Sequence, residues 1–447
     1  MEETIDLKRR EFIRMGLIGT AGLVAAPALM TSCSGDKLKD VEVPEILPRA
    51  VDGRPLKAGL VGCGGRGTGA ALNFLNAGDG LSLVAMGDLF PDQLEMSRGK
   101  LKAAGVEVPD DKCFTGFDAF KKVIDSDIDI VLLCTPPVFR PEHFAYAVEK
   151  GRHVFAEKPC AVDSVGAKRM LATSKIASSK GLCVISGTVR RSEKDCIETY
   201  KRVAGGMIGD IVSAHVLRFG RNGWVRKRRP EWSDMEYMIR NWQNFCWTSG
   251  DFILEQFIHE IDQMTWFTGD KHPVLAQATG GRLRRVTGDL HDFISVEYTY
   301  ENGLRAHCTS RQIGGCDNTK NIMVYGTKGY TNCTDTIFDL QGNVLWKYPY
   351  PEKDAADQSM AVPNPFVEEH IRLVTAIRRS EHLNDMEKHV QSVLICLMGR
   401  QSAYTGKFVT WDEVIASQEK LAPDVIEFGP VPGFKEEWPK MGVEYNI

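Results

Sequence analysis

Three ionisable side chains, Glu255, His259 and Asp262, stand four and three residues apart in the stretch 241–262. On a helix this spacing would place all three on one face. A carboxylate and an imidazole on one face can move a proton to or from a substrate hydroxyl. One helix with two ligands and no H-E-x-x-H pattern does not make a zinc site, so we expect no metal. The alternative interpretation is a solvated helix face around a core histidine.

Lys158 is a second group that could do chemistry, and it stands in Glu157-Lys158-Pro159 directly after the apolar run 154–156. Charged side chains that follow a strand of a doubly wound parallel sheet lie at the edge where ligands bind. A lone lysine is most often a solvated surface group, but this position favours a place in a binding site.

A glycine-rich turn follows the apolar run 56–61 and precedes a helical pattern, so the order is strand, turn and helix. In its G-x-G-x-x-G spacing, Gly62 allows the tight turn, Gly64 lets the backbone approach a pyrophosphate, and Gly67 lets the helix pack close to the strand. The free N–H groups at the helix N-terminus attract the phosphates. The sequence therefore predicts a dinucleotide site rather than a glycine turn without function.

Asp88 follows the second apolar run, 81–86, at the distance from the glycines where an acid binds the ribose hydroxyls of NAD. No Arg or Lys follows it directly to hold a 2′-phosphate, so we expect NAD rather than NADP. A third apolar run, 128–134, ends in Thr135-Pro136. The expected cofactor-binding residues lie in the turn and after the strands: Gly62, Gly64, Gly65, Arg66, Gly67, Asp88, Thr135, Pro136, Glu157 and Lys158.

Composition restricts the class of protein. A length of 447 residues favours two domains, and 43% apolar with 26% charged residues is ordinary for a globular chain. A net charge of −4 lacks the basic footprint of a nucleic-acid binder. Twelve scattered cysteines without a C-x-x-C pair argue against a disulfide-stapled fold or a structural zinc site.

The second half of the chain changes to alternating patterns, at 211–216, 293–298 and 321–325, which are typical of strands with one polar face. We therefore predict an α/β protein with an N-terminal Rossmann dinucleotide-binding domain and a C-terminal α+β domain with an open, largely antiparallel sheet. The expected divisions are a signal at 1–36, a linker at 37–55, the NAD-binding domain at 56–187, the substrate and oligomerisation domain at 188–425, and a tail at 426–447.

The first 36 residues have the order of an export signal: Lys8-Arg9-Arg10, then an uncharged run from Met15 to Ser34. The paired arginines, with Phe12 two positions on, resemble the bacterial twin-arginine signal. Small residues before Cys33 resemble a lipoprotein processing site, with simple cleavage or an uncut anchor as alternatives. We expect a periplasmic protein or a membrane-anchored lipoprotein, touching the membrane only through this segment.

The strand–glycine turn–helix order, the acid at Asp88, Thr135-Pro136 and above all Glu157-Lys158-Pro159 together resemble the Gfo/Idh/MocA oxidoreductases over about residues 55–415. Two later stretches, 364–370 and 398–407, are similar to an exported twin-arginine subgroup of that family. The resemblance implies that Lys158 acts in catalysis beside the nicotinamide. It also implies a homo-oligomer formed through the free sheet face, and a helix from Phe366 that returns to the first domain.

The same resemblance matches Glu255 and His259 to an Asp and a His of the family, so Glu255 is a departure that adds one methylene. It also makes Arg191 a candidate substrate-binding residue in preference to Arg190. Five of the eight tryptophans lie between 224 and 266, interleaved with arginines, an arrangement that suits a sugar ring or packing at a domain contact. The expected substrate-binding residues are Arg191, Trp242, Trp247 and His259.

These observations favour an oxidoreductase that uses tightly held NAD on a hydroxyl of a sugar, a glycoside or a cyclic polyol. Lys158 and His259 would move the hydroxyl proton, with Glu255 tuning or relaying it. Because no free NAD pool is expected outside the cytoplasm, a second hypothesis is a redox-neutral glycosidase like the glycoside hydrolase family 109 enzymes, which oxidise, eliminate, add water and reduce. A third is a binding protein with a vestigial site, against which the intact motif residues argue.

Overall fold

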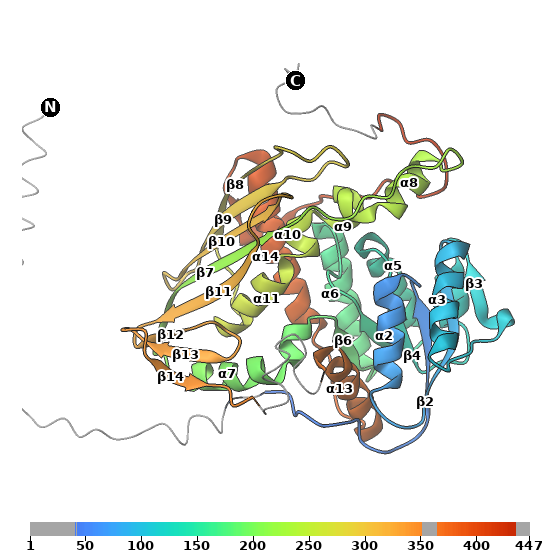
Figure 1. The fold of residues 1–447 in the computed structure, drawn as a ribbon, viewed down its shortest axis with the longest axis horizontal. Helices are drawn as coiled ribbons and strands as arrows, with labels where there is room; N and C mark the ends of the chain where they lie inside the picture. Colours follow the sequence, from blue (N-terminus) through green and yellow to red (C-terminus); the bar gives the residue numbers. More distant parts are fainter. Residues whose placement is uncertain (1–40, 42, 351–363, 435–447) are drawn as a thin grey trace, which may run out of the picture.

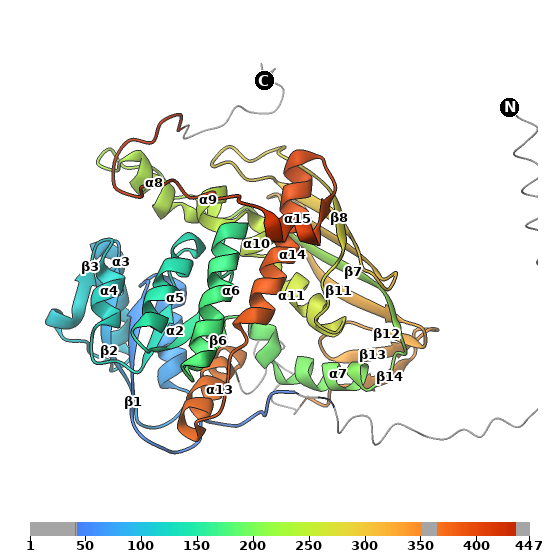
Figure 2. The ribbon, with the colours of Figure 1, turned by 180° about the vertical axis from the view of Figure 1, so that it is seen from behind.

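The computed structural model describes residue 41 and residues 43–350 and 364–434. The expected signal at 1–36, with Cys33, lies outside the described residues, as does the end of the tail from 435. Two sheets stand side by side, each with its helices, and the chain crosses between them more than once (Figures 1 and 2). Within the described ranges, no helix has both the length and the apolarity that a membrane span needs.

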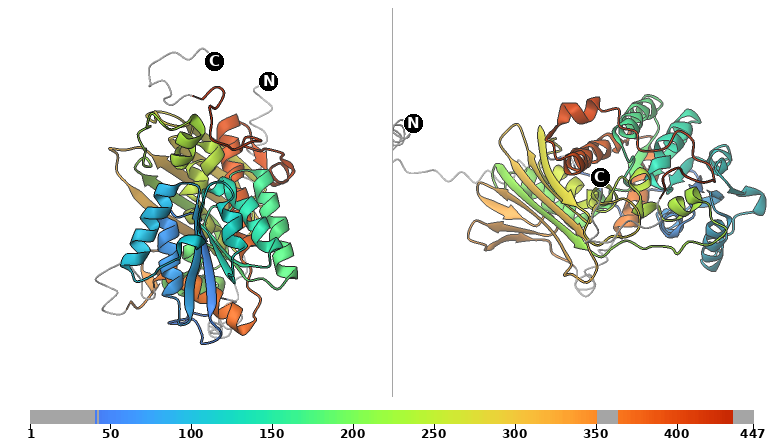
Figure 3. Two further views of the ribbon diagram at one scale, coloured as in Figure 1. Left: turned by 90° about the vertical axis from the view of Figure 1, so that its right-hand side faces the viewer. Right: turned by 90° about the horizontal axis from the view of Figure 1, so that it is seen from above.

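The first sheet is wholly parallel, with the doubly wound order β3-β2-β1-β4-β5-β6. The predicted apolar runs form β1 (Leu56–Val61), β2 (Leu81–Asp88), β4 (Ile130–Leu133) and β5 (His153–Ala156). The short strands β3 (Cys113–Thr115) and β6 (Val184–Ser186) form the two edges of the sheet. Helices cover both faces, as Figure 3 shows end-on. One face carries α2 (Gly65–Leu75) and α3 (Pro91–Ala103), and the other carries α4 (Ala119–Ile124), α5 (Arg140–Glu149) and α6 (Ser164–Ser179).

A late helix completes the core of this first domain. Asn364 caps α13 (Pro365–Arg379) by accepting a hydrogen bond from the N–H of Phe366. On its inner face, Leu373, Val374 and Ile377 pack into the same apolar cluster as β1 and α2. The predicted return of the helix from Phe366 to the first domain is confirmed.

The second sheet has nine strands in the order β14-β13-β12-β11-β7-β10-β9-β8-β15. All neighbours are antiparallel except β7 and β10. Alternate residues face the helices α7 (Lys194–Ala204), α11 (Ile258–Phe267) and α14 (Met386–Thr405), and the described residues place no helix on the opposite face (Figure 3). The predicted fold class is confirmed. The strands are β7 (Ile211–Gly220), β8 (Leu275–Gly281), β9 (Phe293–Thr299), β10 (Arg305–Gln312), β11 (Thr319–Gly326), β12 (Gly329–Thr331), β13 (Thr336–Asp339), β14 (Val344–Lys347) and β15 (Val409–Thr410).

Two segments of the second half cross back over the first domain. After β7 the chain reaches α8 (Asp234–Arg240), and after α15 (Trp411–Ala416) the last described segment runs alongside it (Figure 2). The N–H of Met235 donates to the carbonyl oxygen of Gly429, and Phe428 and Phe434 pack into the cluster around α8. We call residues 426–434 the C-terminal strap.

Candidate active site

A cavity of about 380 Å³ opens at the carboxyl ends of β1, β2 and β4, and the glycine turn forms one wall. Gly62 has φ +95°, and a Cβ on Gly67 would lie 1.8 Å from the carbonyl oxygen of Gly62. A Cβ on Gly64 or Gly65 would meet nothing within 4 Å, so the backbone there faces open space at the start of α2. This bare backbone at a helix N-terminus fits a pyrophosphate, as the sequence predicted. Thr135 and Pro136 line the same cavity.

Asp88 also lines the cavity. Its two carboxylate oxygens accept hydrogen bonds from the N–H groups of Cys63, at 2.6 Å, and Phe90, at 2.8 Å. Burial raises the pKa of Asp88 above its usual value. Arg240 of α8 also lines the cavity and stacks over the ring of Phe90, 3.8 Å from its centroid. Arg240 was expected only as one of the arginines that interleave with the tryptophans, because only the fold brings α8 to this edge.

Arg66 of the glycine turn forms an ion pair with Glu157 of the Glu-Lys-Pro motif. Its Nη2 also lies 3.6 Å from Oε2 of Glu369 on α13. Glu369 is fully buried, and burial raises its pKa well above the usual value. The turn that would hold the phosphates and the motif that carries Lys158 are therefore joined through one guanidinium group.

Lys158 reaches across to Glu255, and the bond from Lys158 to Pro159 is cis. Its Nζ donates to the backbone carbonyl oxygen of Glu255 and lies 3.5 Å from Oε1 of the same residue. Gln243, which lines the cofactor cavity, also lies 3.5 Å from that Oε1 through its Nε2. The lysine and the carboxylate that were predicted to work together are thus in direct contact.

The prediction that Glu255, His259 and Asp262 share one helix face is wrong. Glu255 ends the short helix α10 (Phe252–Glu255), and α11 begins at Ile258. In one continuous helix the carbonyl oxygen of Glu255 would accept the N–H of His259. Lys158 occupies that carbonyl instead, and the N–H of His259 donates to Gln256, at 3.4 Å. The break therefore separates Glu255 from the helix that carries His259 and Asp262.

Asp251 sets the start of α10. It has φ +80°, which is a strained conformation for a residue other than glycine, and it follows Gly250, also at φ +80°. Its carboxylate accepts hydrogen bonds from the N–H of Ile253 and of His291 and from the hydroxyl of Tyr404. These bonds hold the strained turn that presents Glu255 to Lys158.

His259 is half-buried beside Lys158. Burial lowers its pKa well below the usual value, and the positive charges of Lys158 and Arg218 lower the pKa further. The imidazole is therefore neutral at pH 7 and is able to accept a proton.

Two predicted substrate-binding residues lie outside this group. Arg191 is buried and forms ion pairs with Asp262, at 2.9 Å, and Asp270, at 2.8 Å. Trp247 is buried in the cluster around α8. Trp242, in contrast, lines the cofactor cavity next to Gln243.

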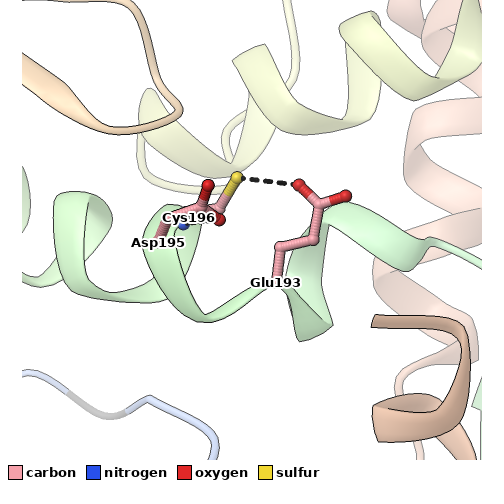
Figure 4. A group of neighbouring side chains, drawn as sticks. All are labelled: Glu193, Asp195 and Cys196. Atoms are coloured by element: carbon pink, nitrogen blue, oxygen red, sulfur yellow. Dashed lines mark hydrogen bonds between the residues drawn. The ribbon is translucent and has the colours of Figure 1, made fainter. Parts of the chain in front are cut away.

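Glu193, Asp195 and Cys196 form the one group of three metal-ligand side chains that the described part of the chain brings together, at the start of α7 (Figure 4). Each member has a protein partner. Glu193 pairs with Arg190, Tyr350 donates to Asp195 at 2.6 Å, and the Cys196 thiol lies 3.3 Å from Glu193. Burial raises the pKa of Cys196 well above its usual value, so the thiol stays protonated. We assign no metal to this group.

Comparisons with known proteins agree with the geometry. A model described as "Oxidoreductase family, NAD-binding Rossmann fold" matches residues 56–187, and a "GFO/IDH/MocA C-terminal domain" model matches residues 197–332, together more than half of the chain. The chain belongs to the Gfo/Idh/MocA family of oxidoreductases.

Individual Gfo/Idh/MocA relatives are distant. The chain is 28% identical to "Inositol 2-dehydrogenase 4" of Saccharopolyspora erythraea over 49% of this chain and 55% of that protein. It is 22% identical to a "Glycosyl hydrolase family 109 protein" of Shewanella pealeana over 63% and 60% of the two chains. The matches thus span only 55% and 60% of these relatives.

A solved structure of the same fold is that of scyllo-inositol dehydrogenase from Lactobacillus casei with bound NAD(H) and scyllo-inositol. It has TM-score 0.59 and 21% identity, covering 80% of this chain and 99% of that chain. At this identity the likeness shows the fold. The first domain of this Gfo/Idh/MocA chain is an NAD-binding Rossmann domain.

Proposed function

We propose that the protein oxidises a hydroxyl of a sugar, a glycoside or a cyclic polyol with NAD held in its first domain. The observation that carries this proposal is the contact of Lys158 with Glu255 beside the neutral imidazole of His259, next to a cavity that fits a dinucleotide. The distant relative named as an inositol 2-dehydrogenase supports a cyclic polyol or a sugar as the substrate class.

Each of the three side chains has a distinct part in this chemistry. His259 is neutral at pH 7, so it accepts the proton of the substrate hydroxyl. The Lys158 ammonium group stabilises the negative charge that develops on the hydroxyl oxygen. Glu255 holds that ammonium group through its backbone carbonyl oxygen and its carboxylate. When bound, NAD supplies the hydride acceptor.

NAD is preferred to NADP in this proposal. The Asp88 carboxylate lies in the cavity, where it would accept ribose hydroxyls and repel a 2′-phosphate. Arg240 is near, but its guanidinium group is already bound to Asp92, at 3.0 Å, and to Glu236, at 2.8 Å. It is therefore not free to pair with a phosphate.

We further propose that the cofactor is held tightly, because the C-terminal strap and α8 close over one side of the cavity. Phe428 of the strap packs on Phe90 and Phe117, with ring centroids 5.9 and 5.1 Å apart, and both of these rings line the cavity. These contacts hold two walls of the cavity in place, which would slow the release of a dinucleotide.

Export and assembly complete the proposal. The twin-arginine pattern at 8–12 supports transport to the periplasm, with Cys33 as the site of a lipid anchor. The uncovered face of the second sheet supports a homo-oligomer, because that face has no helix of the described residues against it. Cell fractionation with a Cys33→Ala variant, and light scattering of the purified protein, test these two points.

A redox-neutral glycosidase is the second candidate. A cofactor that stays bound suits a reaction that oxidises and then reduces the same sugar, and the similarity to a glycosyl hydrolase family 109 protein supports this class.

One experiment separates the candidates. The protein is purified without added cofactor and denatured, and the released NAD(H) is quantified. The native protein and a Lys158→Ala variant are then assayed on free sugars, cyclic polyols and aryl glycosides. Net NADH formation that is lost in the variant supports the oxidoreductase. Release of the aglycone without net NADH supports the glycosidase. Bound NAD without turnover of any substrate overturns both.

A further inference from the structure

The helix-facing side of the second sheet changes from apolar to cationic at one end. Along β7, Ala214 and Val216 are buried against the helices, and along β11 Ile322 and Val324 are buried in the same way. Side chains alternate in direction along a strand, so the next inward positions are two residues farther along. These positions hold Arg218 and Lys320.

Arg218 and Lys320 stand directly opposite each other across the antiparallel pair of β7 and β11. Like charges at such positions destabilise a sheet. One carboxylate group serves both: Oε1 of Glu260 accepts from Nη1 of Arg218 at 2.7 Å and lies 3.6 Å from Nζ of Lys320. In the part of the chain that the structure describes, this is the one ion pair of Lys320, and it is too long for a hydrogen bond.

This cationic end of the sheet adjoins the catalytic group, because Glu260 follows His259 in α11. Arg190, from the 3₁₀ helix Val189–Ser192, adds a third positive charge near the imidazole. Its own partner is Glu193. Cations from the first sheet, from the 3₁₀ helix and from two strands of the second sheet therefore surround His259.

The arrangement leaves one positive charge without a close partner. Glu255 contacts Lys158, Glu193 pairs with Arg190, and Glu260 binds Arg218, which leaves Lys320. Burial and the charge of Arg190 lower the pKa of Lys320, so its charged form is disfavoured as the site stands. An anion bound there would remove this penalty, whereas a neutral sugar would not.

We infer that the substrate carries a carboxylate group, as a uronic acid does, and that Lys320 and Arg218 bind this group beside His259. The inference rests on the proposed function and names its substrate class. A carboxylate brings a single negative charge for Lys320, whose ion pair with Glu260 is long, whereas a phosphate brings nearly two. Charge-assisted hydrogen bonds to such a group strengthen binding and fix the ring relative to the imidazole.

The test uses sugars that differ only at this group. Methyl glucuronide, galacturonide and mannuronide are compared with methyl glucoside, galactoside and mannoside, with glucose 6-phosphate as a further arm. Binding to the NAD-loaded protein is measured by tryptophan fluorescence, and turnover by NADH formation. Lys320→Gln is the variant, because the Lys320 side chain is 41% exposed and makes no hydrogen bond in the described structure. Lys347→Gln, at an exposed position on β14, is the matched control for loss of one positive charge.

We expect at least one uronide to bind about 10-fold or more tightly than its neutral partner. Lys320→Gln should remove most of that preference, because it should weaken binding of the uronide more than binding of the neutral sugar, and Lys347→Gln should retain the preference. Equal binding of both members of every pair, tighter binding of the phosphate, or an equal loss for both members in Lys320→Gln overturns the inference.

The two readouts separate this inference from the proposed function. Turnover of neutral sugars without preference for an acid leaves the oxidoreductase standing and overturns the carboxylate site. Selective binding of a uronide without turnover in any assay leaves the carboxylate site standing and overturns the proposed oxidoreductase. Neither binding nor turnover with any of these sugars overturns both.

Discussion

The Nζ of Lys158 donates to the backbone carbonyl oxygen of Glu255, and this contact separates α10 from α11. The lysine thus has a structural and a chemical relation to the same residue. It takes a carbonyl oxygen that a continuous helix would use internally, and it brings its ammonium group next to the Glu255 carboxylate and to His259. The contact that interrupts the helix therefore also brings the side chains of the candidate site together.

Lys158→Met should lower kcat by about 10²- to 10⁴-fold, because it removes the group that stabilises charge on the substrate oxygen. Because Lys158 does not line the dinucleotide cavity, the amount of NAD that copurifies should stay unchanged. Lys175→Met, at an exposed position on α6, is the control and should be active. Steady-state kinetics and quantification of bound NAD check both points. A Lys158→Met protein with normal kcat would contradict the role given to this lysine.

The acid side of the pH profile should report His259. Its pKa is lowered well below 6.5 by burial and by the nearby cations, so the imidazole stays neutral from pH 8 to well below pH 6.5. We expect kcat/KM to hold through that range and to fall only as the pH drops through the lowered pKa. Lys320→Gln removes one of the cations that lower the pKa of His259, so the fall of kcat/KM for a neutral sugar should move to higher pH in this variant. An acid limb that stays in place in this variant would show that another group is titrating.

Phe428→Ala should speed the release of NAD by about 10-fold, because it removes the ring of the C-terminal strap that packs on Phe90 and Phe117. Release is followed by the NAD that remains after repeated gel filtration, and by the rate of exchange with labelled NAD. Val425→Ala is the control, since Val425 is exposed and lies just outside the strap. An unchanged rate of NAD release in Phe428→Ala would show that the strap does not retain the cofactor.

His370 should make the protein sensitive to acid. It is buried between Phe74 and Phe155, neither ring nitrogen has a hydrogen-bond partner, and burial lowers its pKa to about 3. Below pH 6.5 the unfolded chain therefore binds a proton that the folded chain does not, so stability is lost as the pH falls from 6.5 toward 3. From pH 6.5 to pH 5 this amounts to roughly 2 kcal/mol.

The measurement is urea unfolding of the native protein and of His370→Leu at both pH values. The variant should lose less free energy of unfolding than the native protein over this interval, by roughly the amount above. His382→Leu, at an exposed position, should lose as much as the native protein. The same loss in all three proteins would mean that His370 is protonated in the folded state.

The sequence predicted the local features well. Continuous apolar runs identified β1, β2, β4 and β5, and alternating runs identified β7, β9 and β11, because both patterns reflect burial of each strand's own residues. The glycine turn was also predictable, since a Cβ at Gly67 would collide with the backbone of Gly62. These constraints act within a few residues or within one strand–turn–helix unit.

The errors concern contacts between distant parts of the chain. A spacing of four residues predicted one helix through Glu255 and His259. No local pattern indicates that Lys158, 97 positions away, donates to the backbone carbonyl oxygen of Glu255. Arg191 was assigned to the substrate from the family resemblance, and its ion pairs with Asp262 and Asp270, 71 and 79 residues distant, leave no local signal in the sequence. The place of Arg240 at the cofactor cavity was not predicted, because its partner Asp92 is 148 residues distant.

The position of α13 bears on how the protein unfolds. Residues 56–187 match a family model by themselves, yet Leu373, Val374 and Ile377 supply part of the apolar core beneath β1 and α2. A fragment that ends at residue 187 would leave that part of its core open to water. Residues 56–187 therefore do not unfold independently of the rest of the chain. Calorimetry of the whole chain should give one transition instead of two. A substitution that destabilises the late helix α13 would therefore also destabilise the dinucleotide-binding domain.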